Sequence, residues 1–388
     1  MPWKKDGVSE ERFRFIEEWK SDDWSLAELC EQFGVTRKTG YKWLERYEAA
    51  GMEGLRDQSR APHRHPNALT EASQERILKV RAEHPYWGAR KIRAFLKRQE
   101  GADVIPAVSS IGNLLKTNGL TIPRKRRPRA RPSQQPLAHA TEANRVWCAD
   151  FKGWFRSGNG DRIDPLTISD AYSRYLLRCQ AVRAADLAHS QPIFEAAFRE
   201  YGLPDRMRTD NGAPFGSNGE SGLTGLSVWW IKLGIVPERI QPGKPQQNGR
   251  HERMHRTLKQ ATACPPARNR GAQQRRFDQF RWEYNEQRPH EALGQATPAS
   301  CYAPSARPYP RRLAEVEYPE GWQVRRVSPG GQIRWRTEYI FVAHALQGEV
   351  VGIEPVEDGR WRVWFSFYDI GILDAARLRI RRPEPCKP

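Results

Sequence analysis

The sequence predicts a multidomain protein with all-α helix-turn-helix units at the N-terminus, an α/β core and a small β-barrel at the C-terminus. Three observations predict this arrangement. Apolar residues recur at helical spacing between residues 10 and 50, and short apolar runs that end in acids begin at Val146. Short strands rich in β-branched and aromatic residues follow Trp322.

The charge balance indicates a polyanionic partner. The chain has 388 residues, and 64 Lys and Arg against 46 Asp and Glu give a net charge of +18, which favours nucleic acid. We find no apolar run near the roughly 18 residues that a membrane-spanning helix needs, and the polar start lacks a secretion signal. The six cysteines form no C-x-x-C pair, so we expect neither a zinc knuckle nor a disulfide framework, and the pattern fits a reducing cytosol.

Residues 10 to 50 have the pattern of a helix-turn-helix. Ser25 and Glu28 form a capping box at the start of one helix, Gly34 breaks the chain, and Thr36 can cap a second helix. The inner face of the second helix is predicted to contain Tyr41, Trp43, Leu44 and Tyr47. Gly40 weakens the helix prediction, since Gly costs about 1 kcal/mol relative to Ala inside a helix.

The start of the second helix is a candidate DNA-binding surface. In a helix-turn-helix this end enters the major groove, and here it contains Thr36, Arg37, Lys38 and Lys42. The alternative is a solvated basic helix in an ordinary three-helix bundle.

Two further N-terminal segments are candidates for DNA contact. Residues 69–120 read as a second helical unit, either DNA-binding or only a spacer, with Ser109-Ser110 as the cap of its last helix. The following linker is rich in Pro and basic residues and is expected to stay extended. It either follows DNA phosphates or only aids solubility, and its central basic residues are Arg124, Lys125, Arg126 and Arg127.

Three acidic residues stand out in the predicted α/β core. Asp150 and Asp210 each end a short apolar strand, which would place them side by side on one sheet edge, and Glu252 lies in the first turn of a helix predicted from about residue 249 to 263. Buried acids repel one another and need cations. Two Mg²⁺ ions about 3.5–4 Å apart would satisfy them and align a phosphodiester, and Mn²⁺ can substitute. For any single Asp at a strand end, a turn cap is the commoner explanation.

The local sequences around these acids carry a specific resemblance. Residues 147–150 (WCAD), 209–212 (TDNG) and 245–252 (PQQNGRHE) resemble the three signatures of retroviral-integrase-like DDE transposases. Residues 284–293 and Thr297-Pro298 resemble the bacterial insertion-sequence members of that class. The resemblance covers roughly residues 140 to 305. It implies a ribonuclease H-like fold in which Asp150 bridges two metals, Asp210 completes one metal site and Glu252 completes the other.

The helix that contains Glu252 is expected to grip DNA as well. Glu252, His255, Arg256 and Lys259 are spaced to share one helical face, and the alternative is a surface ladder of salt bridges. Asn248 and Gly249 resemble the loop that positions the DNA end in this class. Residues 216–225 are an unusually long insert, which we interpret as a surface loop.

The C-terminal segment predicts a barrel from alternating residues. Trp361, Val363 and Phe365 alternate with Arg362 and Trp364, and the turn at residues 357–359 is a hairpin signal. Similar proteins carry an SH3-like barrel here that touches DNA or another subunit. Its arginines would suit DNA, although a structural barrel with a solvated basic face fits almost as well.

These observations together give one predicted function and two alternatives. The resemblance implies a transposase that binds the terminal inverted repeats of a mobile element, cuts a strand and joins the freed 3′-hydroxyl to target DNA, as a dimer or tetramer in a synaptic complex. The alternatives are a catalytically inactive DNA-binding regulator and a nuclease that cuts without joining.

The predicted domain boundaries follow the same patterns. They are a helix-turn-helix domain (1–53), a linker (54–68), a second helical DNA-binding domain (69–120), a basic linker (121–140), the catalytic core (141–305), a linker (306–321) and the barrel (322–388).

Overall fold

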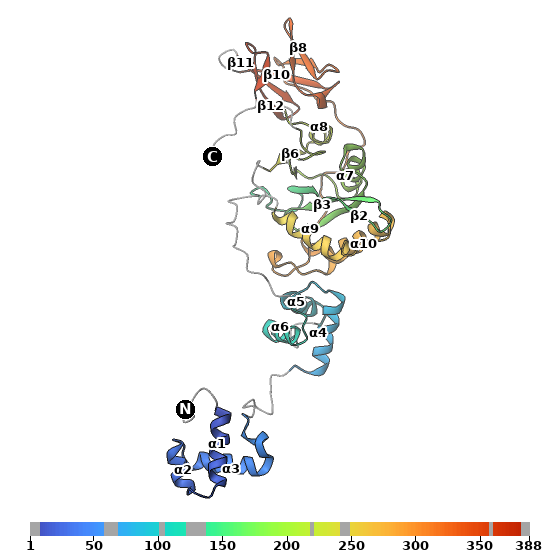
Figure 1. Ribbon diagram of the computed structural model, residues 1–388. Coiled ribbons are helices and arrows are strands. Elements are labelled where there is room, and N and C mark those ends of the chain that lie inside the picture. The colour runs from blue at the N-terminus through green and yellow to red at the C-terminus, as the bar shows by residue number, and fades with distance from the viewer. Residues whose placement is uncertain are drawn as a thin grey trace. The chain divides into compact units, whose positions relative to one another are not determined.

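The computed structural model describes residues 8–57, 69–100, 105–121, 137–217, 221–240, 249–356 and 360–381. It divides into two compact units, Met1–Leu69 and Thr70–Pro388. In its described residues the first unit contains only helices and turns, whereas the second unit combines helices with two β-sheets (Figure 1). None of the helices within the described ranges is long and apolar enough to cross a membrane.

The first unit is a three-helix bundle with the predicted caps. It consists of α1 (Val8–Lys20), α2 (Leu26–Gln32) and α3 (Arg37–Ala50), followed by a 3-10 turn (Gly51–Leu55). The capping box of Ser25 and Glu28 is present, and the Thr36 side chain accepts a hydrogen bond from the backbone of Thr39. Gly34 has a φ of 63°, which favours glycine at this turn. The helix-turn-helix prediction is therefore confirmed in its local structure.

Close packing explains the glycine inside α3. A Cβ on Gly40 would lie 2.6 Å from the Cys30 sulfur and 3.1 Å from the Phe15 ring, so only glycine lets α3 approach α1 and α2 this closely. The predicted inner face was wrong in one position, because Tyr41 is 63% exposed while Trp43 and Leu44 are buried.

The second unit begins with three helices that contact the core. They are α4 (Glu71–Glu83), α5 (Ala89–Glu100) and α6 (Val108–Thr117). The predicted Ser109-Ser110 cap is wrong, because the cap is Ala107, two residues before Ser109, and it makes no side-chain hydrogen bond. His84 lies 2.9 Å from the Glu283 carboxylate, and the Tyr86 hydroxyl donates to the Gln260 carbonyl at 2.9 Å.

A mixed sheet forms the centre of the second unit. Its strands are β1 (Val146–Phe151), β2 (Phe155–Arg156), β3 (Arg162–Asp170), β4 (Leu176–Val182), β5 (Arg206–Thr209) and β6 (Val236–Arg239). The order is β4-β3-β1-β5-β6, with β2 also on β3. The pairs among β1, β3 and β4 are antiparallel, whereas β5 is parallel to both β1 and β6.

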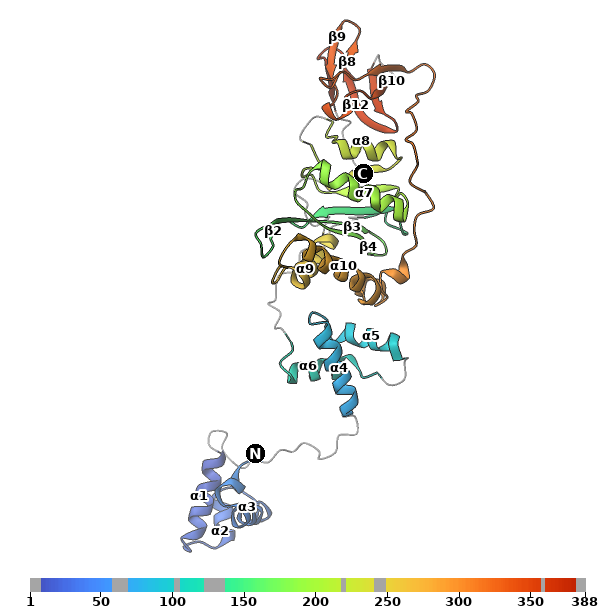
Figure 2. The ribbon, with the colours of Figure 1, turned by 90° about the vertical axis from the view of Figure 1, so that its right-hand side faces the viewer.

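Helices cover both faces of this sheet (Figure 2). One face packs on α7 (Leu187–Tyr201) and α8 (Gly225–Lys232), and the other packs on α9 (Gly249–Thr262) and α10 (Arg270–Trp282), which continues into a π-helical turn (Glu283–Gln287). Alternation along β3 explains the two layers, because Leu166 and Ile168 join the first core and Ile163 joins the second.

The predicted surface loop at residues 216–225, of which 218–220 lie outside the described residues, has no helix or strand before Gly225, but its end is buried. Leu223 is buried, and Thr224 caps α8, whose apolar residues are buried all round. Leu223, Val228 and Ile231 join the core of the C-terminal barrel, and Lys232 pairs with Glu349 at 2.7 Å. Leu223 and α8 therefore belong to the contact between the sheet layer and the barrel.

The C-terminal barrel is a nearly closed seven-stranded sheet. Its strands are β7 (Gln323–Arg326), β8 (Gln332–Trp335), β9 (Glu338–Phe341), β10 (Val350–Val356), β11 (Arg360–Phe365), β12 (Tyr368–Asp374) and β13 (Arg379–Arg381), in the order β7-β10-β11-β12-β13-β9-β8. The Arg325 guanidinium donates to the Arg334 carbonyl, which links the two edge strands. Val363 and Phe365 point inward as predicted, and the predicted turn at 357–359 lies outside the described residues.

Candidate active site

The parallel pairing of β1 and β5 brings two of the predicted acids to the same sheet edge. Cys148 and Arg208 are the last pair in the register, so Asp150 and Asp210, each two residues further along its chain, lie toward the same edge of the sheet. Neighbouring strands are about 4.8 Å apart. Asp150 is 9% exposed, and Asp210 follows the last residue of β5. Burial raises the pKa of Asp210, while a hydrogen bond from the backbone N–H of Gly212 at 3.2 Å lowers it.

A buried polar cluster joins Asp150 to α9. The Thr167 hydroxyl, in the middle of β3, lies 3.1 Å from the Asp150 carbonyl oxygen, 2.9 Å from His251 Nε2 and 2.6 Å from His255 Nε2. His255 Nδ1 is 3.7 Å from the Asp150 carboxylate. Burial lowers the pKa of His251 to about 4 and that of His255 to about 2, so both rings are neutral near pH 7 and the contact with Asp150 is not an ion pair.

The hydrogen-bond directions in this cluster place two acceptors face to face. The Thr167 hydroxyl donates to the Asp150 carbonyl, so both imidazoles must donate to Thr167 from Nε2. A neutral His255 then presents the lone pair of Nδ1 to the Asp150 carboxylate. A shared proton or a cation beside the carboxylate would stabilise this pair of acceptors, so the donor set fits a divalent metal.

The third predicted acid is on the correct helix, but it is exposed. Glu252 lies in the first turn of α9, which His251 and His255 hold against the sheet. Among the described residues, no three His, Cys, Asp or Glu side chains lie together as a metal-binding group. The structure therefore places Asp150 and Asp210 at the same edge of the sheet and packs the start of α9 against Asp150, without gathering the Glu252 carboxylate there.

The predicted basic face of α9 requires a correction. His255 is buried against Thr167, whereas Glu252, Arg256 and Lys259 are exposed. The four residues therefore do not form one surface. A helix that packs on a sheet buries the side chains on one of its faces, and His255 lies on that face. Arg256 and Lys259 remain available to an anion.

The other predicted DNA-binding residues fall in three places. Thr36, Arg37, Lys38 and Lys42 are all exposed at the start of α3 in the first unit. Gly249 begins α9. Asn248 and the basic run Arg124, Lys125, Arg126 and Arg127 lie outside the described residues.

Sequence reasoning missed two residues beside the site. Thr167 was part of a predicted strand without any role, and a polar residue amid an apolar strand was the available signal. Lys152 follows Asp150 by two residues and faces a pocket that also touches α9. No periodicity marks such a residue.

Known domain families match almost the whole chain in succession. A helix-turn-helix domain matches residues 11–63 and a homeodomain-like domain matches residues 39–115. The integrase core domain matches residues 140–245 and 233–298, and the C-terminal domain of IS481 family transposases matches residues 322–380.

Whole proteins with similar sequences come from bacterial insertion elements. A 39.2 kDa protein of element IS476 from Xanthomonas euvesicatoria is 27% identical over 72% of this chain and 78% of its own. A 31.7 kDa protein of element IS407 from Burkholderia multivorans is 28% identical over 61% of this chain and 83% of its own. The InsD transposase of element IS2 from Escherichia coli is 28% identical over 58% of this chain and 75% of its own.

Solved structures give weaker similarities. The catalytic core of HTLV-2 integrase in complex with magnesium is 15% identical, over 42% of this chain and 98% of its own, with a TM-score of 0.33. A simian T-cell lymphotropic virus intasome is 16% identical, over 74% of this chain and 95% of its own, with a TM-score of 0.39. TM-scores this low decide nothing about the fold.

An integrase core preceded by helix-turn-helix domains defines a class of protein, the DNA-binding enzymes that transfer DNA strands. Within that class, the chain belongs to the bacterial insertion-sequence transposases of the DDE type. It is a polynucleotidyl transferase that acts in DNA transposition and integration.

Proposed function

We propose that Asp150, Asp210 and Glu252 together bind two Mg²⁺ ions, for which Mn²⁺ can substitute, and that this site cuts and joins DNA strands. The observation that carries the proposal is the parallel β1–β5 pairing, which directs Asp150 and Asp210 to the same sheet edge, together with the contact of His255 on Asp150. Glu252 reaches the ions by a rotamer change or a shift of the first turn of α9, once cations offset the repulsion among the three carboxylates.

The chain's own residues position the reacting groups. Bound metal supplies charge stabilisation for the attacking and leaving oxygens and lowers the pKa of a water that attacks the phosphodiester. His255 and Thr167 fix the Asp150 backbone and limit the movement of its carboxylate. Arg256 and Lys259 are exposed one and two turns beyond Glu252, where they hold DNA phosphates.

We propose that the N-terminal helices recognise the terminal inverted repeats of the element. Thr36, Arg37, Lys38 and Lys42 contact the major groove, and the basic run of residues 124–127 follows the backbone. Because two element ends must be held together, the active form is a homo-oligomer, a dimer or tetramer, that also binds target DNA in the bacterial cytoplasm, on the nucleoid. The core fold is ribonuclease H-like, and the domain boundaries are those given by the sequence pattern.

Carboxylate replacement tests the assignment. Asp150→Asn, Asp210→Asn and Glu252→Gln should each abolish Mg²⁺-dependent cleavage and strand transfer of labelled element ends, since each removes one anionic ligand. Binding of the ends in a gel-shift test should stay close to wild type. Glu286→Gln, which changes an exposed acid of the core, is the matched control and should retain activity.

Two outcomes would contradict the assignment. Full strand transfer by any of the three variants would remove that residue from the metal site. Cleavage by the wild-type protein without joined product would favour a nuclease over a transposase.

A further inference from the structure

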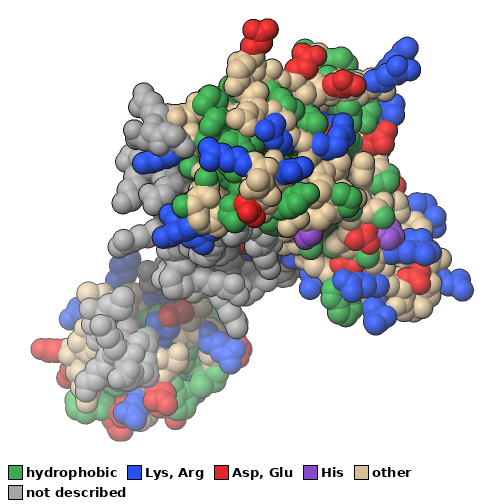
Figure 3. All heavy atoms as spheres, turned by 90° about the horizontal axis from the view of Figure 1, so that it is seen from above, with side chains coloured by type: hydrophobic (Ala, Val, Ile, Leu, Met, Phe, Trp, Pro, Cys, Tyr) green, Lys and Arg blue, Asp and Glu red, His purple; other side chains and the backbone are tan. Residues whose placement is uncertain are grey.

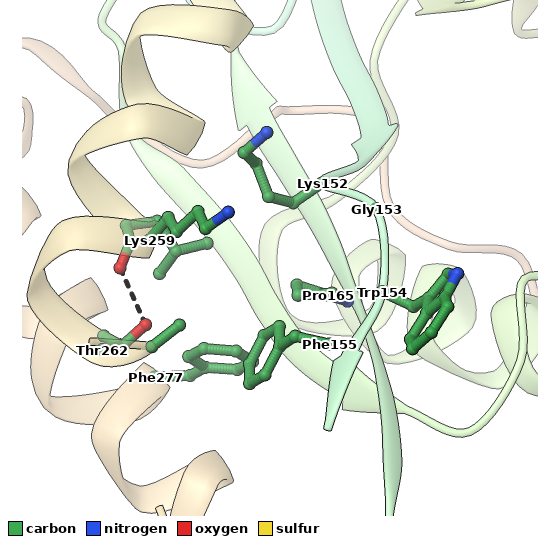
Figure 4. Close-up of a pocket in the computed structure, with 10 residues that line it drawn as sticks. Lys152, Gly153, Trp154, Phe155, Pro165, Lys259, Thr262 and Phe277 are labelled. Atoms are coloured by element: carbon green, nitrogen blue, oxygen red, sulfur yellow. Dashed lines mark hydrogen bonds between the residues drawn. The ribbon is translucent and has the colours of Figure 1, made fainter. Parts of the chain in front are cut away.

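A pocket of about 130 Å³ opens beside the acidic edge. It lies between the segment that follows β1 and the last turns of α9, with Phe277 of α10 at its base (Figure 4). Lys152 is two residues from Asp150 and Lys259 is seven residues from Glu252. The pocket is therefore next to the proposed metal site, but contains none of its three acids.

The lining of the pocket is divided between apolar and cationic groups. Phe155, Phe277 and Leu258 supply apolar surface, whereas Lys152 and Lys259 extend their ammonium groups on one side (Figure 4). No ion pair joins either lysine to another residue within the described ranges. The pocket thus offers a planar apolar group a place to pack and offers an anion two free cations.

The size of the pocket limits what can enter it. An apolar cavity of roughly 150 Å³ accepts a benzene ring, so a pocket of about 130 Å³ fits one six-membered ring and is small for a fused pair. Ligand pockets for drug-sized molecules are larger, at about 300 Å³ or more. A nucleobase with a single ring is small enough for this volume. The phosphates on either side of such a base would contact the two lysines.

The surface outside the pocket continues the same chemistry. Trp154 lines the rim of the pocket and is 55% exposed (Figure 4). The guanidinium groups of Arg156 and Arg162 lie 5.7 and 5.3 Å from its ring centre. Exposed aromatic rings beside basic groups are typical of surfaces on which unpaired bases stack.

We propose that this pocket holds one unstacked pyrimidine base of the DNA strand next to the bond that is cut, with the adjoining phosphates on Lys152 and Lys259. Enzymes that act on a duplex can take a base out of the stack and hold it between apolar side chains. The inference rests on the proposed function only for its location, because the acids define where the cut strand runs.

Filling the pocket tests the proposal without catalysis. Ala263, which directly follows α9, lines the pocket, whereas Ala261 in the last turn of α9 is exposed. We would measure, by fluorescence anisotropy in EDTA, how the full chain and its Ala263→Phe and Ala261→Phe variants bind labelled single strands. The probes are oligothymidylate, an abasic strand of the same length and oligodeoxyadenylate.

We expect the binding affinity to depend on the presence of bases in the strand, and we expect only one of the two variants to lose this dependence. Wild type and Ala261→Phe should bind oligothymidylate on the order of ten-fold more tightly than the abasic strand, the size expected of one stacked base. Ala263→Phe should bind both strands equally, with the abasic affinity unchanged, which also verifies that it is folded. Oligodeoxyadenylate should bind more weakly than oligothymidylate.

Three results would overturn the proposal: equal binding of thymidylate and abasic strands by wild type, a thymidylate preference that survives Ala263→Phe, or equal binding of the two base types. None of these involves metal or strand transfer. Failure of the base pocket is therefore distinguishable from failure of the acid assignment, which the carboxylate variants test.

Discussion

At the scale of single residues, Thr167 lies fully buried in the middle of β3 and connects two elements through one hydroxyl. It contacts the Asp150 carbonyl and both His251 and His255 of α9. A buried donor or acceptor that loses its partner costs about 1–3 kcal/mol. The position of α9 over the acidic edge therefore depends on this residue.

Replacing that hydroxyl with a methyl group should loosen α9. Thr167→Val keeps the shape but leaves both histidine Nε2 atoms without their partner, so we expect a loss of about 1–3 kcal/mol in unfolding free energy and slower strand transfer. Thr167→Ser should restore both. The control is Thr257→Val, where the hydroxyl contacts only the carbonyl of Arg253 in its own helix. Wild-type stability and activity in Thr167→Val would show that the cluster has no role.

His290 should make the second unit sensitive to acid. Burial, together with the positive charges of Lys91 and Arg288, lowers its pKa from 6.5 to about 3. The folded state therefore binds fewer protons than the unfolded state between these values, so the stabilisation is complete above pH 6.5 and is lost as the pH falls toward 3. In thermal unfolding from pH 7 to pH 4, His290→Leu should lose less stability than wild type. Parallel pH profiles would contradict this.

At the scale of elements, the strands and helices with clear periodicity were predicted well. The strands predicted to end at Asp150 and Asp210 end at Phe151 and Thr209, and the helix that contains Glu252 also appears close to its expected range. The placement of the two strands relative to each other could be predicted by assuming that they pair in parallel. The position of Glu252 relative to the other acids could not follow from the sequence, because it depends on the rotation of α9 and on charges that the chain alone does not balance.

The missed elements lacked an amphipathic pattern. The apolar residues of α8 are buried all round, between the sheet layer and the barrel, so the helix has no polar face to mark its period. The glycine-rich segment that precedes α8 led to the prediction of a loop. Short strands such as β7, β12 and β13 are defined by pairing with their neighbours rather than by local composition.

Helix packing in the first unit gives a prediction opposite to helix propensity. Gly40→Ala should gain up to about 1 kcal/mol of propensity but lose about 1–3 kcal/mol to the clash with Cys30 and Phe15, so hydrogen exchange of α1–α3 should speed up. The control is Gly112→Ala in α6, where the nearest atom lies 3.9 Å away. That variant should slow exchange in α4–α6. Slower exchange in Gly40→Ala would contradict the close packing.

At the scale of the whole molecule, both the net charge and the order of the domains indicate a protein that binds DNA. Lys and Arg side chains are spread among apolar and acidic groups over the face seen in Figure 3, consistent with the net charge of +18. A spread of positive charge attracts DNA without specifying sequence, whereas the exposed start of α3 supplies the side chains for specific contact. The composition alone predicted the general attraction to DNA. The side chains for specific contact were predicted only from the order of the motifs.

The central claim is that three distant acids share divalent cations at the end of β1. Crystals of the full chain with element-end DNA and Mn²⁺, measured for anomalous scattering, test it most directly. We predict two manganese peaks about 3.5–4 Å apart, with carboxylate oxygens of Asp150, Asp210 and Glu252 each about 2.1 Å from an ion. Peaks elsewhere, or peaks at this edge with Glu252 still turned to solvent, would contradict the claim.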